Sequence, residues 1–136
     1  MKLIIFCGIP GSGKTTISKQ MSEENNYVRI SMDEEKYIRH TEMIEPIVNY
    51  LKSGKSVIAD SLYDLREHRE RLLDAVKDVE CERICIVIDT PLEESIRRNN
   101  TRPEPLPRGL IECIYEHFEH PSMDEGWDEI VHIDNK

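Results

Sequence analysis

Short apolar runs and longer amphipathic stretches alternate along this chain. The apolar runs have the length of buried strands and lie at residues 3–7, 27–31, 56–60, 82–89 and 129–133. Apolar residues at helical spacing predict helices at residues 16–21, 34–53, 65–79, 91–99 and 110–118. We expect Ile38 to face the core, Pro46 to kink or split its helix, and Asp64 and Thr90 to cap the helices that follow them.

Five strands that alternate with helices predict an α/β fold. Parallel strands need crossover helices, so we expect a three-layer α/β/α sandwich around a five-stranded parallel sheet. The length of 136 residues fits a single domain, 1–136. Three prolines between residues 100 and 109 predict an exposed flap, which we expect to act as a short lid at about 98–109. Apolar runs stay well short of the roughly 20 residues of a membrane span, so we expect a cytoplasmic protein with no membrane partner.

The first apolar strand leads into the pattern G-x-x-x-x-G-K-T at residues 8–15, followed by a predicted helix. Glycines permit positive φ, so the backbone N–H groups can surround phosphate oxygens at the helix N-terminus. We expect Lys14 between the β- and γ-phosphates of ATP, and the Thr15 hydroxyl on Mg²⁺. The alternative is a glycine-rich turn that binds nothing, which the flanking strand and helix argue against. The expected ATP contacts are Gly8, Ile9, Pro10, Gly11, Ser12, Gly13, Lys14, Thr15 and Thr16.

Two aspartates stand at the ends of later strands. Asp33 follows the second predicted strand and Asp60 ends the third, which places both at the sheet edge where such folds bind ligands. Transfer of a phosphoryl group needs a carboxylate that receives the acceptor's proton, and Asp33 is our candidate. Its alternative role is to cap a helix that begins at Glu34. Asp60 is placed to hold a Mg²⁺-bound water or the acceptor.

Arginines near the flap and on the third predicted helix are candidates for binding anionic groups. Arg98 and Arg102 could close over ATP and neutralise the transferred phosphate, whereas a solvated helix end is the alternative and Arg97 could take either role. Arg66 and Arg69 could hold a phosphate of the acceptor. Ion pairs with neighbouring glutamates explain those two arginines equally well.

The net charge of −9 limits the partners of this chain. Residues 103–136 hold nine acids and two bases, whereas residues 1–102 are nearly balanced. A nucleic acid would therefore have to meet a local basic patch, because the surface as a whole does not attract polyanions.

Taken together, these motifs resemble the kinase domain of polynucleotide 5′-kinases, within the wider group of P-loop kinases that includes seryl-tRNA kinases and zeta-toxin-like kinases. The likeness lies in residues 8–15, 31–33, 57–69, 89–102 and 118–130. It implies that the lid arginines contact ATP phosphates, that Asp33 activates a 5′-hydroxyl, and that residues 118–127 lie near the adenine. Lys36 stands where some members have an arginine, and Ser61 where members often have asparagine or threonine. Both differences fall on the side of the site where the acceptor would bind. The resemblance implies that Lys36 is one of the residues that contact the acceptor.

The expected function is therefore an ATP- and Mg²⁺-dependent kinase whose acceptor is the 5′-hydroxyl of a nucleic acid or oligonucleotide. A kinase of a small metabolite or of an aminoacyl-tRNA hydroxyl is the alternative, and the acidic charge favours it. A third hypothesis is a non-catalytic binding protein gated by ATP. The choice between DNA and RNA and the oligomeric state stay open at this point.

Overall fold

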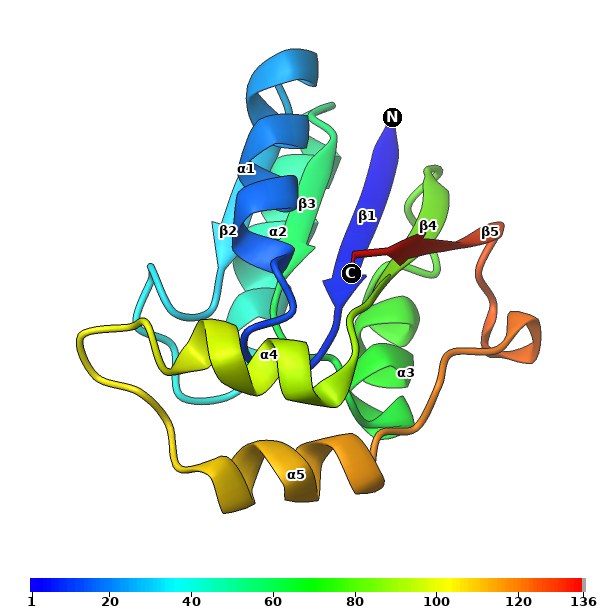
Figure 1. The fold of residues 1–136 in the computed structure, drawn as a ribbon. Helices are drawn as coiled ribbons and strands as arrows, with labels where there is room; N and C mark the ends of the chain where they lie inside the picture. Colours follow the sequence, from blue (N-terminus) through cyan, green and yellow to red (C-terminus); the bar gives the residue numbers. More distant parts are fainter. Residues whose placement is uncertain (136) are drawn as a thin grey trace.

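A computed structural model describes residues 1–135, and Lys136, the last residue of the predicted domain, lies outside them. All strands of the central sheet run parallel, in the order β2-β3-β1-β4-β5 (Figure 1). The predicted five-stranded parallel sheet is thus confirmed. The strands are β1 (Lys2–Cys7), β2 (Val28–Ser31), β3 (Val57–Asp60), β4 (Glu82–Asp89) and β5 (Glu129–Asp134).

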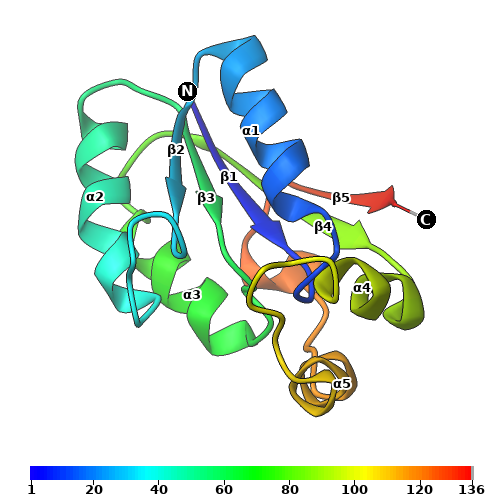
Figure 2. The same cartoon turned by 60° about the vertical axis from the view of Figure 1, so that its left-hand side comes forward.

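The helices form layers on both faces of this sheet. One face carries α1 and the other carries α2 and α3, while α4 and α5 cross the edge where the strands end (Figures 1 and 2). This arrangement confirms the predicted three-layer α/β/α architecture. The helices are α1 (Lys14–Asn25), α2 (Thr41–Lys52), α3 (Arg66–Ala75), α4 (Leu92–Asn99) and α5 (Arg108–Glu116).

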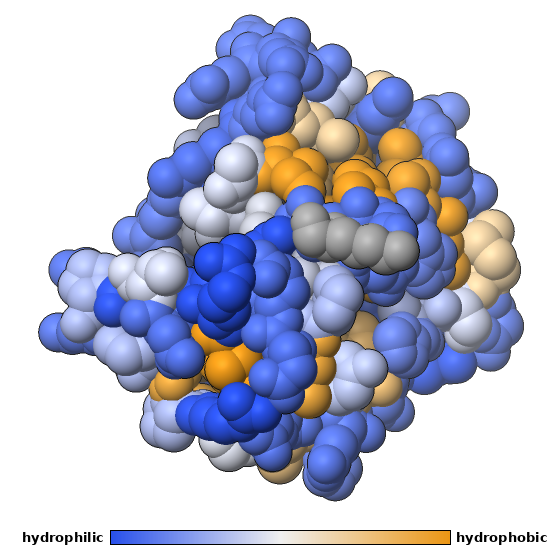
Figure 3. Space-filling view, in the orientation of Figure 1, coloured by the Kyte–Doolittle hydropathy of each residue, from blue (hydrophilic) through white to orange (hydrophobic). Residues whose placement is uncertain are grey.

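The hydrophobic core is divided by the sheet into two parts. In β1, Leu3 and Ile5 face α2 and α3, whereas Ile4 and Phe6 face α1, and all four side chains are buried. Burial on both faces explains why the sequence of this strand is continuously apolar. α1 covers only part of its face, so apolar side chains remain visible between α1 and β5 (Figure 3).

The predicted helix at 34–53 is wrong in its first part. Residues 32–40 form turns, and α2 begins at Thr41 and continues through Pro46. Lys36 has a φ of 58°, a left-handed conformation that a helix cannot contain, and the Glu42 carboxylate accepts hydrogen bonds from the backbone N–H groups just before α2. Ile38, expected in the core, is consequently 86% exposed.

Two expected helix caps are also absent. Leu65, in an extended conformation, occupies the N-cap position of α3, so Asp64 does not cap this helix. The Asp64 carbonyl instead accepts a hydrogen bond from the Glu119 N–H at 2.8 Å. α4 begins one residue later than a Thr90 cap requires, and the Thr90 hydroxyl donates instead to the Ser12 carbonyl at 2.8 Å. Both residues join elements that are far apart in the sequence, and such contacts are invisible in a local pattern.

A buried ion pair connects α3 to the segment before β5. Arg69 and Glu125 have no exposed side-chain surface, and the guanidinium donates to both Glu125 oxygens, at 2.9 and 3.0 Å, and to the Tyr63 carbonyl at 2.6 Å. Burial alone would raise the pKa of Glu125, but hydrogen bonds from Arg69 and Trp127 outweigh it and hold the pKa below its ordinary value. The prediction that Arg69 binds an acceptor phosphate is therefore corrected, because its guanidinium is enclosed by the protein.

Removing one partner of this pair is expected to destabilise the fold strongly. Arg69→Met leaves the Glu125 carboxylate buried without its countercharge, so we expect the free energy of unfolding to fall by about 3–5 kcal/mol in urea denaturation. Replacing both partners, as Arg69→Met with Glu125→Leu, should restore much of that loss. Arg71→Met, an exposed arginine on the same helix, is the control and should change stability little. Equal stability of Arg69→Met and Arg71→Met would contradict the buried pair.

Candidate functional site

The loop between β1 and α1 has a backbone that only glycine can follow at two positions. Gly11 has a φ of 83° and Gly13 a φ of 99°. A Cβ at Gly11 would overlap the Ser95 carbonyl oxygen, and one at Gly13 would overlap the Asn135 side-chain amide. Left-handed backbone and close packing against α4 and the chain after β5 therefore both require glycine at these positions.

This loop presents backbone donors that lack partners. Within residues 1–135, no protein acceptor is in hydrogen-bond contact with the backbone N–H groups of Gly11, Gly13, Lys14, Thr15 and Thr16. They belong to the turn that leads into α1 and to its first residues, where the helix dipole adds a partial positive charge. A nest of free N–H groups at a helix start is the geometry that binds phosphate oxygens.

Hydrogen bonds from three side chains to the carbonyl oxygen of Ser12 hold the loop in place. That oxygen accepts hydrogen bonds from Asn135 Nδ2 at 2.7 Å, Thr90 Oγ1 at 2.8 Å and Arg98 Nη1 at 3.2 Å. No local pattern pointed to Asn135, which lies just beyond β5, and Thr90 had been predicted to cap a helix. Arg98 therefore supports the loop in this structure.

The charged residues predicted to act on phosphates meet at the loop. Burial lowers the pKa of the Lys14 ammonium below its ordinary value, the nearby Asp60 and Asp33 act in the opposite direction, and Arg102 lowers it further. These interactions place Asp60, Asp33 and Arg102 within electrostatic reach of Lys14. Four side chains predicted separately from the sequence thus converge on one edge of the sheet.

Asp60 is anchored by a residue that the sequence analysis missed. Asp60 is 4% exposed, and its Oδ2 accepts from Arg29 Nη2 at 2.6 Å and from Ser18 Oγ at 2.7 Å. Arg29 also pairs with Glu34 at 2.6 Å, which ties β2, β3 and the segment after β2 together. A charged residue inside a short apolar strand was the signal that could have revealed Arg29.

Asp33 lies in the turn that follows β2, with its side chain exposed. No helix begins at Glu34, so the alternative that Asp33 caps such a helix is ruled out. The Lys36 N–H donates to the Asp33 carbonyl at 3.2 Å, which closes the turn and keeps the two residues together. The Asp33 carboxylate is thus available at the edge that Lys14 and Asp60 occupy.

The remaining arginine candidates fall into two groups. Arg66 pairs with Glu70 and Asp124 on α3 and the segment before β5, and Arg97 pairs with Glu94 on the exposed side of α4. Arg102, in the flap after α4, forms no ion pair in the part of the chain that the structure describes. Among the flap arginines, Arg102 is therefore the one whose guanidinium is free to bind a phosphate.

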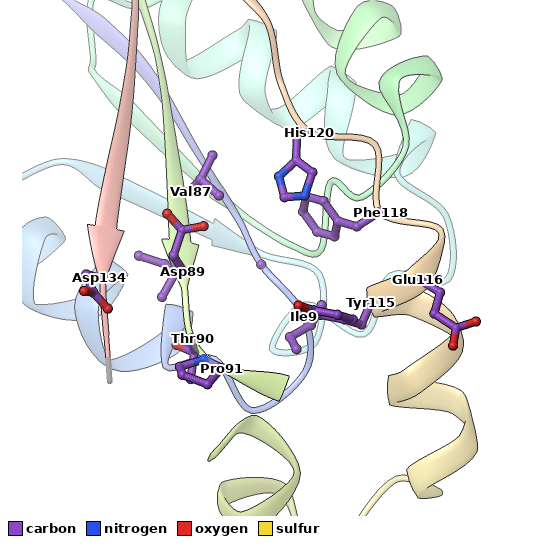
Figure 4. Close-up of a pocket in the computed structure, with 12 residues that line it drawn as sticks. Ile9, Val87, Asp89, Thr90, Pro91, Tyr115, Glu116, Phe118, His120 and Asp134 are labelled. Carbon is purple, nitrogen blue, oxygen red and sulfur yellow. The ribbon is translucent and has the colours of Figure 1, made fainter. Parts of the chain in front are cut away.

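A cavity of about 590 Å³ lies beside the loop, between the ends of β4 and β5 and the end of α5. Figure 4 shows Phe118 and His120 facing Val87 and Asp89 across it, with Ile9 of the loop nearby. Residues 118–127 were expected to lie near the adenine. Only the first part of this segment, which includes Phe118 and His120, borders the cavity next to the loop. Residues 122–127 instead pack on α3 through ion pairs with its arginines.

Two histidines pack together beside the end of β3. His40 Nε2 lies 2.8 Å from Ser61 Oγ, and its ring stacks on His68 with the ring centres 4.2 Å apart. Burial, and then the neighbouring His68, lower the pKa of His40 to about 4. This contact fastens the segment that carries Asp33 to the end of β3.

The titration of His40 predicts a pH-dependent stability. The unfolded chain takes up a proton at His40 near pH 6.5, whereas the folded protein resists protonation down to about pH 4. The unfolded state therefore binds more protons in this range, and the free energy of unfolding should fall as the pH is lowered from 6.5 toward 4. Urea denaturation at stepped pH should show a weaker dependence for His40→Gln. An identical pH profile in wild type and variant would refute this role.

In residues 1–135 no helix is both long and apolar enough to cross a bilayer, and no group of three or more His, Cys, Asp or Glu side chains is arranged to hold a metal ion.

The sheet order, the nest of free N–H groups and the half-buried Lys14 define a P-loop nucleotide-binding domain of the kinase type. The chain belongs to the family described as AAA domain, whose model matches residues 3–121. This match and the relatives below confirm the resemblance to P-loop kinases that the sequence motifs predicted.

Similar proteins include two kinases and a solved nucleotide complex. The chain is 29% identical to L-seryl-tRNA(Sec) kinase of Methanococcus maripaludis over 93% of its length, and 25% identical to the bifunctional polynucleotide phosphatase/kinase of Schizosaccharomyces pombe over 97%. It spans 56% and 33% of those proteins, respectively. Chaetomium thermophilum Kti12 in complex with ADP-AlF3 has the same fold, with a TM-score of 0.76, 19% identity, and coverage of 97% of this chain and 88% of that one.

Proposed function

We propose that this domain transfers the γ-phosphate of ATP to a hydroxyl group, and that the acceptor is the 5′-hydroxyl of a nucleic acid or oligonucleotide. The observation that carries the proposal is the convergence of Lys14, Asp33, Asp60 and Arg102 around a nest of unpartnered N–H groups. A binding protein gated by ATP needs the nest and the lysine, but it has no use for a free carboxylate opposite them.

The residues present fit ATP and Mg²⁺. The Ser12 hydroxyl is buried in the loop without a hydrogen-bond partner in the described part of the chain, and the free N–H groups surround the same turn. The Thr15 hydroxyl and the Asp60 carboxylate offer the hard oxygen ligands that Mg²⁺ prefers, with Asp60 acting through water. When bound, Mg²⁺ would neutralise charge on the β- and γ-phosphates.

Each side chain then has a defined task in the transfer. Asp33 receives the proton of the acceptor hydroxyl while the hydroxyl oxygen forms a bond to the γ-phosphorus of ATP. The bond between the γ-phosphorus and the β–γ bridging oxygen breaks at the same time, and ADP is released. Lys14 and Arg102 stabilise the charge on the migrating phosphoryl group. Arg98 holds the loop in place through the Ser12 carbonyl. We assign Lys36, three residues after Asp33, to binding of the acceptor.

The flap arginine gives a matched pair of variants. Arg102→Lys keeps the charge but loses the planar guanidinium, so we expect kcat to fall roughly 10- to 100-fold while the KM for ATP changes little. Arg97→Lys should leave kcat unchanged, because Arg97 is exposed and paired with Glu94. Steady-state assays of ADP formation measure both, and equal kcat values would remove Arg102 from the mechanism.

The 5′-hydroxyl acceptor is supported by the polynucleotide phosphatase/kinase among the relatives. A second candidate acceptor, the hydroxyl of an aminoacyl-tRNA, is favoured by the higher identity to the seryl-tRNA(Sec) kinase and remains compatible with the acidic surface. The same four side chains would act on either hydroxyl.

A labelling experiment separates these candidates. The chain is incubated with Mg²⁺ and γ-labelled ATP in parallel reactions with a 5′-hydroxyl oligonucleotide, seryl-tRNA, a mixture of nucleosides, or no acceptor. We expect label on the oligonucleotide. Label on seryl-tRNA or on a nucleoside alone would show that this molecule, and not a 5′-hydroxyl oligonucleotide, is the acceptor. Tight ATP binding without transfer to any acceptor would instead support the hypothesis of a binding protein gated by ATP.

A further inference from the structure

Arg29 is a nearly buried cation that has no part in the proposed transfer as described so far. Its side chain, on β2, is only 8% exposed. Arg29 lies opposite Ile58 of β3, two residues before Asp60 ends that strand. Because side chains two residues apart in a strand share a face of the sheet, this long side chain reaches along the sheet to the edge that carries the carboxylates.

Each nitrogen of the Arg29 guanidinium donates to a different segment of the chain. Nη2 donates to Asp60 of β3 at 2.6 Å, Nη1 to Glu34 in the turn after β2 at 2.6 Å, and Nε to Ser18 of α1 at 2.8 Å. Figures 1 and 2 show α1 next to β2 and β3. A lysine carries all its donors on one nitrogen, so only an arginine can make these three contacts together.

The contacts at Asp60 fix the orientation of its carboxylate. Arg29 and Ser18 both donate to Oδ2, and Asp60 is buried. Within residues 1–135, no group donates a hydrogen bond to the other oxygen, Oδ1. A carboxylate that two donors hold by one oxygen keeps its second oxygen in one position, which is what a partner of a metal-bound water requires.

The contacts at Glu34 fix the turn that carries Asp33. Oε2 of Glu34 accepts from Arg29 at 2.6 Å, and Oε1 lies 3.0 Å from Nζ of Lys19 on α1. Glu34 directly follows Asp33, so the two cations tie this turn to β2 and to α1. Asp33 itself forms no ion pair in the part of the chain that the structure describes. Its position therefore depends on the anchoring of its neighbour.

We infer that Arg29 is a positioning residue for phosphoryl transfer, because one guanidinium holds Asp60 directly and holds Asp33 through Glu34. The inference rests on the proposed function and adds a residue that acts only through those two carboxylates. A displacement of a reacting group by about 1 Å can reduce the rate about 100-fold. An ion pair that served stability alone would leave the rate of the folded protein unchanged.

Glu34→Gln tests the contact that leads to Asp33. The Glu34 side chain is 48% exposed, so the urea midpoint should not change. We expect kcat for a 5′-hydroxyl oligonucleotide to fall about 10-fold at an unchanged KM for ATP. In an Asp33→Asn background the same substitution should lower kcat less than about twofold, because Glu34 acts through Asp33. An equal loss in both backgrounds would overturn the inference, and Glu35→Gln, in the same turn, should have no effect in either.

Arg29→Lys tests the contact with Asp60. We expect kcat to fall about 100-fold. In calorimetry, the Kd for ATP should rise about 10-fold with Mg²⁺ present and stay unchanged in EDTA, because Asp60 acts at the metal. Arg69→Lys is the control, since it alters another buried arginine–carboxylate pair. That control should lower the urea midpoint but leave kcat and both Kd values unchanged. Wild-type kcat and Kd values in Arg29→Lys would overturn the inference.

Failure of this inference is distinguishable from failure of the proposed function. If wild type phosphorylates the oligonucleotide and both Glu34→Gln and Arg29→Lys do so at the wild-type rate, Arg29 serves stability alone and the proposed function stands. If wild type does not phosphorylate the oligonucleotide, the proposed function falls, and the inference with it. If Arg29→Lys does not fold, the comparison of Glu34→Gln in the two backgrounds decides.

Discussion

Replacing Lys14 with methionine is expected to lower kcat/KM for phosphoryl transfer by about a thousandfold or more. Lys14 is half-buried at the start of α1, and burial lowers the pKa of its ammonium while the nearby Asp60 and Asp33 favour its charged form. Methionine keeps the length of the side chain but offers no positive charge to the β- and γ-phosphates. The weakened binding should appear as a higher Kd for ATP in calorimetry.

The control for this variant is Lys52→Met, which removes an exposed lysine from α2. It should leave both transfer and ATP affinity unchanged. A Lys14→Met protein that folds normally and still transfers phosphate at the wild-type rate would show that the loop does not bind the transferred phosphate of ATP.

Asp33→Asn is expected to reduce kcat by about 10²- to 10⁴-fold while ATP binding survives. The amide has nearly the same shape as the carboxylate but cannot accept the proton of the attacking hydroxyl. Because Asp33 is exposed in a turn and caps no helix, the substitution should leave the free energy of unfolding close to that of wild type. Single-turnover transfer and ATP calorimetry together distinguish lost chemistry from lost binding.

Glu35→Gln is the matched control, since it neutralises an exposed carboxylate two residues away in the same turn. We expect it to be as active as wild type. Equal activity of Asp33→Asn and Glu35→Gln would exclude Asp33 as the base and leave Asp60 as the remaining aspartate at this edge.

The strands and the phosphate-binding loop were predictable because their signals are local. A continuous apolar run such as residues 3–7 is buried on both faces of a parallel sheet wherever it occurs. The glycine pattern of residues 8–15 likewise reports a backbone shape, confirmed by the positive φ values of Gly11 and Gly13. The order of strand, loop and helix then placed Asp33 and Asp60 at one edge without knowledge of any contact.

Failures of prediction have a common physical origin in contacts between distant segments. The partners of Arg69 and Asp60, namely Glu125 and Arg29, lie 56 and 31 residues away in the sequence. Helical spacing suggested that Ile38 faced the core, but Lys36 in a left-handed conformation ends that periodicity. Local patterns indicate which face of a helix or strand is apolar. They do not show which charged residues from distant parts of the chain form ion pairs with each other.

The most direct test of the central claim is to locate the phosphate that the chain transfers. Wild-type protein is incubated with ATP, Mg²⁺ and a single-stranded 5′-hydroxyl oligonucleotide, and the product is digested and mapped by mass spectrometry while ADP is measured. The proposed function predicts one new phosphate on the 5′-oxygen, with ADP formed in equal amount and both lost in Asp33→Asn. An unmodified oligonucleotide in the presence of bound ATP would contradict it.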